Sequence, residues 1–333
     1  MGESAAAVMS FAALLSRLGA GHAVPGPALA DALGVSRAAV WKQIEQLRAL
    51  GLGIEAKPGA GYRLQAPLEL LDAQAIRAQL SAAARRRLAA LDIVEQTGST
   101  SADLLARASL RASGSVLLAE AQTAGRGQRG RRWESPFASG FLGSVLWRYP
   151  QGLAALSGLS LAVGVAVAET LAGFGFDARL KWPNDLVGSR GKLGGILIDA
   201  AGEVQGPCQV VLGLGLNLRL PDSSRRRIDQ PALALEQLGA TELPSRNVLA
   251  AALIDALLAA LAEFGRHGLA AFAARFEPFD ALRDRRLTIQ AGREPHSGRG
   301  QGIDASGRLA VRLDDGTLRH FVVGEVRVRG AVG

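Results

Sequence analysis

The sequence predicts an α+β protein of several domains, and three observations along its 333 residues lead to this class. Two short helical patterns and a hairpin pattern occupy residues 27–64. Strand and helix patterns alternate over 76–278, which is typical of a mixed sheet covered by helices. From residue 287 onward apolar and polar residues alternate with period two, which predicts a small β domain. We therefore expect three domains, 1–66, 67–278 and 279–333.

The composition limits which cellular compartments and which classes of binding partner fit the chain, but it identifies neither. Hydrophobic residues make up 48% of the chain, and the formal net charge of +8 permits an anionic partner. The single cysteine, Cys208, excludes an intrachain disulfide and fits a reducing compartment, so we expect a cytoplasmic protein. The apolar stretch 5–15 follows Glu3 rather than basic residues, which argues against a signal peptide. No apolar run reaches transmembrane length, and the four histidines show no metal-ligand spacing.

The first domain contains two helical patterns joined by a tight turn. Residues 27–33 form the first, and Ser36 can cap the second, 37–50, by accepting a backbone hydrogen bond. Apolar residues at 40, 44 and 47 define the buried side of the second helix, so its other side is presented outward. A helix-turn-helix of this kind places its second helix in the major groove of DNA.

A short hairpin follows the two helices. Residues 54–57 and 62–64 are separated by the turn sequence Pro-Gly-Ala-Gly, which is the expected wing of a winged helix. Six basic against four acidic residues in 1–66 give only a small positive charge, so a winged helix used for protein contacts alone is an open alternative. DNA contacts are expected from the exposed helix side and the wing, namely from Ser36, Arg37, Trp41, Lys42, Lys57 and Arg63.

A linker over 65–75 leads into the central domain, where Asp72 can cap a helix that runs to about residue 80. Two long helical patterns cover 159–174 and 248–264. Six strand patterns cover 91–95, 116–119, 143–148, 179–181, 195–199 and 209–214. In the last domain, strands over 309–313 and 318–323 flank Asp-Asp-Gly, which predicts a hairpin in a small barrel.

The most informative motif is Gly-Arg-Gly-Gln-Arg-Gly-Arg-Arg-Trp at 125–133, which we call the arginine loop. Glycines let the backbone approach a ligand closely, and arginine binds carboxylate or phosphate with two parallel hydrogen bonds. The glycine spacing also matches a dinucleotide-binding fingerprint, but Pro136 prevents the helix that this fingerprint needs and no acid follows at the right distance. A solvated basic surface loop is the simpler alternative.

Two lysine-containing motifs follow at the ends of strand patterns. Lys-Trp-Pro-Asn-Asp at 181–185 holds a lysine and a carboxylate around a rigid corner, although a structural turn with an exposed ion pair has the same pattern. Gly-Lys-Leu-Gly-Gly-Ile-Leu-Ile at 191–198 lacks the residues of a Walker A loop, since positions 186 and 193 are leucine. The chain has four lysines, and two of them lie in these motifs, where a compact charge can be needed.

These three motifs, in this order, resemble those of the biotin–protein ligases. Residues 97–101, 120–124 and 213–217 match as well, and the flanking domains are similar to those of the bifunctional type, whose winged helix represses biotin-synthesis genes. The resemblance implies that biotin and ATP form biotinyl-5′-adenylate and pyrophosphate, and that biotin then passes to a lysine of biotin carboxyl carrier protein. It also implies a central domain similar to class II aminoacyl-tRNA synthetases and an SH3-like C-terminal barrel.

The resemblance assigns site residues by position. Lys192 would bridge the biotin carboxylate and the α-phosphate, and Asp185 would hold either Mg²⁺ or the ribose. Catalytic roles are implied for Lys192, Arg126, Lys181 and Asp185. Biotin binding is implied for Ser99, Thr100, Ser101, Gln122, Arg126, Gly127, Gln128 and Lys192, and adenylate binding for Arg129, Arg131, Trp133, Asn184 and Asn217. Two positions depart from the pattern, because many members have Asn at Ser101 and some have Arg at Gln128.

The resemblance further implies two macromolecular partners besides the carrier protein. The adenylate would order the arginine loop, permit sheet-edge formation of a homodimer, and so act as corepressor on a two-fold operator DNA. Two other functions fit parts of the sequence. A lipoate-type ligase is argued against by the arginine loop and the N-terminal domain, and a non-enzymatic biotin-sensing repressor is argued against by Lys181, Asp185 and Lys192.

Overall fold

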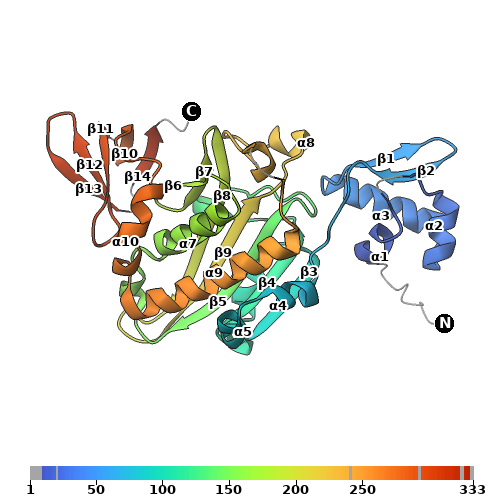
Figure 1. The fold of residues 1–333 in the computed structure, drawn as a ribbon, viewed down its shortest axis with the longest axis horizontal. Helices are drawn as coiled ribbons and strands as arrows, with labels where there is room; N and C mark the ends of the chain where they lie inside the picture. The colour runs from blue at the N-terminus through green and yellow to red at the C-terminus, as the bar shows by residue number, and fades with distance from the viewer. Residues whose placement is uncertain (1–9, 20–21, 240–241, 292–293, 323–325, 331–333) are drawn as a thin grey trace.

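The computed structural model describes residues 10–330 except 20–21, 240–241, 292–293 and 323–325. Three units follow one another along the long axis of the molecule (Figure 1). A small helical unit with a hairpin lies at one end, a large sheet with helices lies in the middle, and a β unit lies at the other end. The predicted α+β organisation is therefore confirmed at this level.

The N-terminal unit contains the predicted helix-turn-helix and wing. Its helices are α1 (Phe11–Leu15), α2 (Gly26–Leu33) and α3 (Arg37–Ala49), and β1 (Ile54–Lys57) pairs antiparallel with β2 (Gly61–Leu64). The Ser36 hydroxyl accepts a hydrogen bond from the backbone of Ala39 at 3.1 Å, as its position before α3 predicts. Helix α1 was not predicted, because five residues are too few to show a period.

A seven-stranded mixed sheet forms the central unit. Its strand order is β3-β4-β5-β9-β8-β7-β6, and only β3 and β4 run parallel. The strands are β3 (Ala90–Thr97), β4 (Ser115–Gln122), β5 (Gly140–Tyr149), β6 (Arg179–Lys181), β7 (Asp185–Gly188), β8 (Gly191–Gly202) and β9 (Cys208–Asn217). All six predicted strands are present. Strand β7 was missed, and β8 begins four residues earlier than predicted, so Lys192 lies inside a strand rather than before one.

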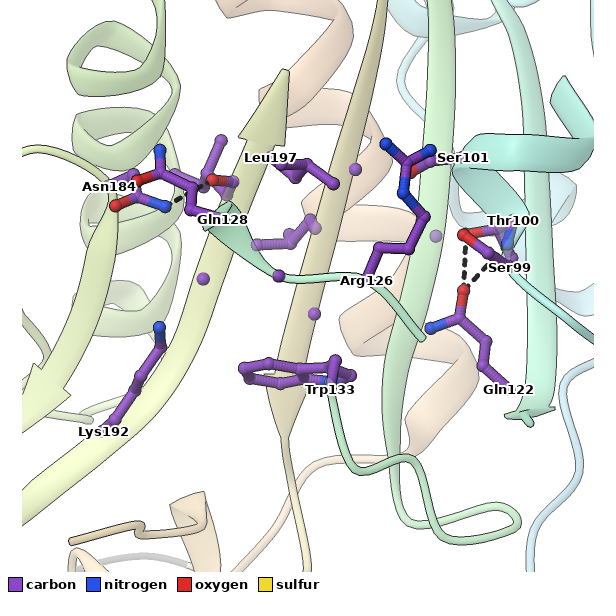
Figure 2. Close-up of a pocket in the computed structure, with 17 residues that line it drawn as sticks. Ser99, Thr100, Ser101, Gln122, Arg126, Gln128, Trp133, Asn184, Lys192 and Leu197 are labelled. Atoms are coloured by element: carbon purple, nitrogen blue, oxygen red, sulfur yellow. Dashed lines mark hydrogen bonds between the residues drawn. The ribbon is translucent and has the colours of Figure 1, made fainter. Parts of the chain in front are cut away.

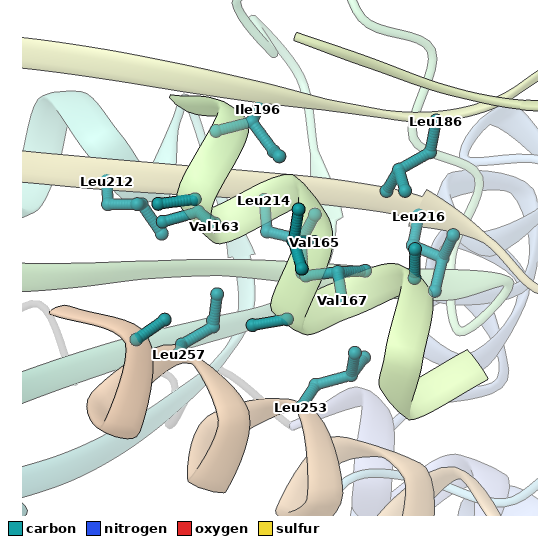
Figure 3. Packing of buried hydrophobic residues seen from close by; sticks show 14 of the residues in the cluster. Val163, Val165, Val167, Leu186, Ile196, Leu212, Leu214, Leu216, Leu253 and Leu257 are labelled. Atoms are coloured by element: carbon teal, nitrogen blue, oxygen red, sulfur yellow. The ribbon is translucent and has the colours of Figure 1, made fainter. Parts of the chain in front are cut away.

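Two long helices, α7 (Leu159–Gly173) and α9 (Arg246–His267), pack on one face of this sheet. Figure 3 shows valines of α7 between leucines of β9 and α9, with Val165 close to Leu214. The helical stretch 153–173, which includes α7, and helix α9 are long and apolar enough to cross a membrane, but half or more of each lies buried inside the protein, which fits core helices. The shorter helices are α4 (Ala73–Gln79), α5 (Ala82–Arg87), α6 (Thr100–Ala106), α8 (Asp222–Arg225) and α10 (Ala270–Phe276).

The C-terminal unit is a five-stranded antiparallel sheet in the order β13-β12-β11-β10-β14. Its strands are β10 (Arg286–Ala291), β11 (Glu294–Ile303), β12 (Leu309–Leu313), β13 (Leu318–Phe321) and β14 (Val326–Gly330). The predicted hairpin is confirmed, and Gly316 takes a positive φ of 86° in its turn. The Trp182 indole donates to the Gly307 carbonyl at 2.9 Å, which fixes this unit beside the start of the 181–185 motif.

Candidate active site

One cavity collects residues from most of the predicted motifs. It lies on the face of the sheet opposite α7, between the arginine loop, the start of α6 and the β7–β8 hairpin, and encloses about 470 Å³ including the space at its mouth (Figure 2). Seventeen residues line it: Ser99, Thr100, Ser101, Gln122, Arg126, Gly127, Gln128, Trp133, Gly143, Asn184, Lys192, Gly195, Ile196, Leu197, Gly213, Leu214 and Gly215. All eight residues expected to bind biotin are among them.

Hydroxyl and amide groups gather at one end of the cavity. The Gln122 Oε1 atom accepts hydrogen bonds from the Thr100 backbone at 2.8 Å and from the Thr100 hydroxyl at 3.1 Å. These two bonds orient the amide, and its Nε2 group keeps donor capacity because its one other contact, to Ser135, is 3.5 Å long. The hydroxyls of Thr100 and Ser101 lie 2.8 and 2.9 Å from that of Ser144.

Ser144 is a site residue that the sequence analysis missed. It lies on β5 and is fully buried. Its hydroxyl is hydrogen-bonded to the hydroxyls of Thr100 and Ser101, the first two residues of α6. A single polar residue in the otherwise apolar run 140–147 was the signal that could have indicated it. The Ser101 hydroxyl is therefore held by Ser144, which gives the smaller side chain at this position a defined orientation.

A lysine and a carboxylate meet at the other end. The Lys192 ammonium lies 2.5 Å from Asp185 Oδ1, and both side chains are largely screened from solvent. The backbone of Lys192 is pinned on both sides, because its N–H donates to Pro231 and its carbonyl accepts from Leu233. Asp185 does not line the cavity itself, but it holds the ammonium that does.

Trp133 lies between the lysine end and the amide end of the cavity (Figure 2). Its ring packs on the backbone of β9, where a Cβ atom on Gly215 would lie 2.7 Å from the ring. The Lys192 ammonium is 5.7 Å from the ring centroid, and the buried indole Nε1 has no hydrogen-bond partner among the residues that the structure describes. The sequence folds this way because Gly125 and Trp133 pair through a 2.9 Å backbone bond, which closes the loop.

The arginine loop also borders a second hollow, which shares Arg126, Gly127 and Gln128 with the cavity. Arg126 forms an ion pair of 3.2 Å with Asp199, whose other carboxylate oxygen is buried and unpartnered among the described residues. Arg131 lines this hollow rather than the cavity, and its side chain is exposed.

Three other expected site residues, Arg129, Asn217 and Lys181, lie outside the cavity lining. The side chain of Arg129 lies outside the described part of the structure. Asn217 donates at 3.0 Å to the carbonyl of Leu233, and so supports the segment that pins Lys192. Lys181 faces Asp185 in the β6–β7 ladder. Asn184, which does line the cavity, donates at 2.7 Å to the carbonyl of Ile196.

Carboxylates are sparse around the cavity. The described residues contain no cluster of three or more His, Cys, Asp or Glu side chains that could hold a metal ion by themselves. Asp185, the one carboxylate at the lysine end, already accepts a bond from Lys192. A divalent ion here would therefore need most of its oxygen ligands from a substrate, as Mg²⁺ in nucleotide sites generally does.

The outward side of α3 forms a separate polar surface on the N-terminal unit. Ser36, Arg37, Trp41 and Lys42 are exposed there, and Trp41 is 58% exposed although it is large and apolar. Lys57 is exposed on the wing, whereas the Arg63 guanidinium is bound at 2.6 Å by Glu55. The hydrogen bond from Arg63 lowers the pKa of the Glu55 carboxyl, which keeps this ion pair charged.

Three family models match successive parts of the chain. The model of an HTH domain matches 12–63, that of the Biotin/lipoate A/B protein ligase family matches 94–217, and that of the Biotin protein ligase C terminal domain matches 284–329. The matched segments follow the order of the three structural units.

Similar proteins extend over nearly the whole chain. The Bifunctional ligase/repressor BirA of Salmonella typhimurium is 39% identical over 96% of this chain and 97% of its own length, and that of Escherichia coli is 38% identical over the same shares. Among solved structures, the biotin protein ligase from Aquifex aeolicus in complex with biotin and ATP superposes with a TM-score of 0.60 and 22% identity, over 73% of this chain and 99% of that one. The structural likeness concerns the fold.

Proposed function

The chain belongs to the family of bifunctional biotin ligase/repressors, and we propose that the cavity between the arginine loop and β8 is where it joins biotin to ATP. The protein is a biotin ligase that also acts as a repressor through its N-terminal helix-turn-helix. The observation that carries the site assignment is the pairing, in one cavity, of a hydroxyl and amide end with a lysine end.

The two ends suit the two ends of biotin. The ureido ring offers one carbonyl acceptor and two N–H donors, and the amide end of the cavity supplies the Gln122 Nε2 donor and hydroxyls that both donate and accept. The valeryl carboxylate would then extend toward Lys192. Trp133 lies between the two ends, and its ring would cover the adenylate once that has formed.

The first reaction brings two anions together, and this is the barrier that the side chains lower. A carboxylate oxygen of biotin attacks the α-phosphorus of ATP, the bond to the β-phosphate oxygen breaks, and pyrophosphate leaves. Lys192 would contact both the carboxylate and an α-phosphate oxygen, which offsets their repulsion and holds them in line. Arg126 would add positive charge after leaving Asp199, and Arg131 would contact phosphate oxygens from the second hollow.

The second reaction transfers biotin to a protein. The neutral amine of a lysine on biotin carboxyl carrier protein attacks the carbonyl carbon of the mixed anhydride, and the bond from that carbon to the phosphate oxygen breaks. AMP leaves with that electron pair, and the nitrogen of the new amide releases a proton to solvent. None of these steps needs a nucleophilic side chain of the ligase. The protein contributes charge, alignment and exclusion of water from an anhydride that water would hydrolyse.

The site fits Mg²⁺ only as an ion carried by ATP. Asp185 could supply one carboxylate oxygen besides the one bound to Lys192, and the phosphates would supply most of the others. Such an ion would neutralise charge on the diphosphate that leaves. The roles of Lys181, Arg129, Asn184 and Asn217 stay predictions, with Asn217 better suited to supporting Lys192 than to contacting a nucleotide.

For repression, we propose that α3 enters the major groove of an operator DNA, with Arg37, Trp41 and Lys42 toward the bases and Lys57 toward the phosphates. Arg63 contributes less because Glu55 holds it. A sheet-edge homodimer fits β8, whose ladder with β7 ends at Gly195, so that residues 197–202 have no strand on that side within the described chain. A cytoplasmic location agrees with both activities.

Mass spectrometry of a biotin carboxyl carrier domain, incubated with the protein, biotin and MgATP, tests the ligase assignment. We expect a mass gain of one biotinyl group on a single lysine, and none when biotin is replaced by lipoate. Gain with lipoate instead would assign a lipoate-type ligase. If the protein bound biotin but released no pyrophosphate, it would be a ligand-sensing repressor and not a ligase.

A further inference from the structure

We propose that Glu95 is an interdomain clasp, a positioning residue that holds the winged-helix unit against the catalytic unit, and that residues 133–137 connect this clasp to the cavity. The proposal deepens the repressor function above and rests on it only for its effect on DNA binding. Glu95 lies on β3, outside the cavity and outside the winged helix, and it belongs to none of the sequence motifs and takes no part in the reaction.

Both oxygens of the Glu95 carboxylate bind the start of α1. Oε2 accepts the N–H of Phe11 at 2.8 Å, and Oε1 accepts the N–H of Ala12 at 2.7 Å, across more than 80 residues of chain. A helix leaves its first N–H groups without partners, and a carboxylate is a strong acceptor for them. The next N–H, of Ala13, is capped locally by Ser10 at 3.1 Å. Two of these three bonds therefore come from the other unit.

A second contact joins the same two units beside the clasp. The Phe137 ring meets the Phe11 ring edge to face, with centroids 5.7 Å apart, and Phe137 is 2% exposed. The N–H of Phe137 donates at 2.8 Å to the carbonyl of Leu50, which ends the DNA-reading helix α3. The apolar core of the winged helix continues into this contact, because Phe137 and Ala138 belong to the same buried cluster as Ile44.

Phe137 is also connected to the cavity through the chain. It follows Trp133 by four residues, and the segment between them is tied down on both sides. The Ser135 hydroxyl lies 3.5 Å from Gln122 Nε2, and Glu134 forms a 3.0 Å ion pair with Arg227. A shift of Trp133 on ligand binding would therefore reach the contact with Leu50 and Phe11 along a short, packed segment rather than through a free loop.

The linker leaves little other freedom to the winged helix. The Glu69 carboxylate is fixed at the start of α9 by the Ser245 hydroxyl at 2.6 Å and by the N–H of Arg246 at 2.8 Å. At the other end, the Gln65 N–H donates at 2.9 Å to Gly53 within the winged helix. Only residues 66–68 separate these anchors. With so short a tether, the clasp and the Phe137 contact determine how the DNA-reading unit is oriented.

Hydrogen–deuterium exchange tests the clasp. If Glu95 only caps the start of α1, its loss affects the amides of that helix alone, whereas a clasp also affects amides at the contact between the two units. Glu95→Ala removes both acceptor oxygens and Glu95→Gln removes one of them, so exchange at the N–H groups of Phe11 and Ala12 would speed up in either variant. A clasp predicts that exchange at the Phe137 amide also accelerates, by about tenfold or more, because its acceptor Leu50 moves away. Asp92→Asn is the matched control, since Asp92 lies on the same strand and pairs with Arg111 within its own unit. Unchanged exchange at Phe137 would overturn the clasp.

Two further measurements test the connection to the cavity and to DNA. In the wild-type protein, biotin with MgATP is expected to alter exchange at Phe11 and Ala12 at least threefold; no change there would refute the connection.

The DNA test uses a duplex that the wild-type protein selects from a random library in the presence of both ligands. Glu95→Ala is expected to keep the ligation rate within about twofold and to bind this duplex with about tenfold lower affinity. Unchanged affinity would show that the clasp does not position the reading helix. If the wild type selects no duplex, the repressor function fails, and the exchange data still decide the clasp.

Discussion

The side chains of Lys192 on β8 and Asp185 on β7 meet diagonally across the β7–β8 hairpin, with 2.5 Å between the ammonium and the carboxylate. The pair holds the only lysine of the cavity lining in place, with both side chains largely screened from solvent. A lysine fixed in this way costs little reorganisation when a substrate carboxylate and a phosphate reach it. The two sequence motifs at 181–185 and 191–198 therefore each contribute one side chain to the same ion pair at the cavity.

Lys192→Ala is expected to lower biotin-dependent pyrophosphate exchange by a factor of roughly 10² to 10³, because the variant lacks the charge between the two reacting anions. Exchange of labelled pyrophosphate into ATP measures the effect. Arg190→Ala is the matched control, since it removes an exposed cation from the turn of the same hairpin. Exchange near the wild-type rate in Lys192→Ala would remove Lys192 from its role.

Gly215→Ala is expected to raise the KM for ATP by about tenfold or more while biotin binding changes less. The new Cβ atom would lie 2.7 Å from the Trp133 ring, so the ring must leave its place between the lysine end and the amide end. Initial rates over a range of ATP concentrations measure the change. Gly173→Ala, where the added Cβ meets nothing within 4 Å, should behave as the wild type. Equal KM values in the two variants would contradict a role for Trp133 over the nucleotide.

Long periodic helices and strong motifs were predictable from local sequence alone. The helix predicted over 37–50 is α3, Arg37–Ala49, and that predicted over 248–264 lies inside α9, Arg246–His267. Local signals were sufficient there because capping residues and apolar spacing act within one helix. Strand β7 was missed because the turn residues of 181–185 hide a strand only four residues long.

The site was predictable as a set of residues but not as a geometry. The motifs indicated eight residues for biotin binding, and one cavity brings all eight together; that they bind biotin stays a prediction. Nothing local indicated that Ser144 joins Thr100 and Ser101, or that Glu95 binds the start of α1, since such pairs are set by tertiary packing between distant segments. For the same reason the sequence did not indicate that the Asn217 amide binds the Leu233 carbonyl in the segment beside Lys192, and its contact with the adenylate stays a prediction.

Arg246→Ala is expected to destabilise the protein by about 3–5 kcal/mol, because it leaves Glu120 charged, buried and unpaired. The pair is 2.8 Å long, with side chains only 7% and 3% exposed, and Glu120 also accepts the N–H of Leu71 from the linker. Chemical denaturation measures the change. Combining Arg246→Met with Glu120→Leu should cost clearly less than the two single changes together, because no charge is then buried alone. Additive costs would mean that the two side chains do not act as a pair.

Glu69→Gln is expected to reveal a contribution to stability that depends on pH. Burial alone would raise the pKa of the Glu69 carboxyl, but hydrogen bonds from Ser245, Arg246 and Asn247 outweigh it and lower the pKa below its usual 4.5. The folded protein therefore favours the ionised form more than the unfolded chain does. The resulting stabilisation is complete above pH 4.5 and disappears as the pH falls through the lowered pKa of the folded state.

Urea denaturation of the wild type and Glu69→Gln, followed from about pH 7 down to about pH 3, checks this dependence. The difference in the free energy of unfolding should stay constant at neutral pH and shrink below pH 4.5, where protonation makes the wild-type side chain as neutral as Gln. Glu242→Gln, at an exposed carboxylate, should show no such trend. A difference that grows as the pH falls would require a raised pKa, and would mean that the start of α9 does not stabilise the charge on the linker.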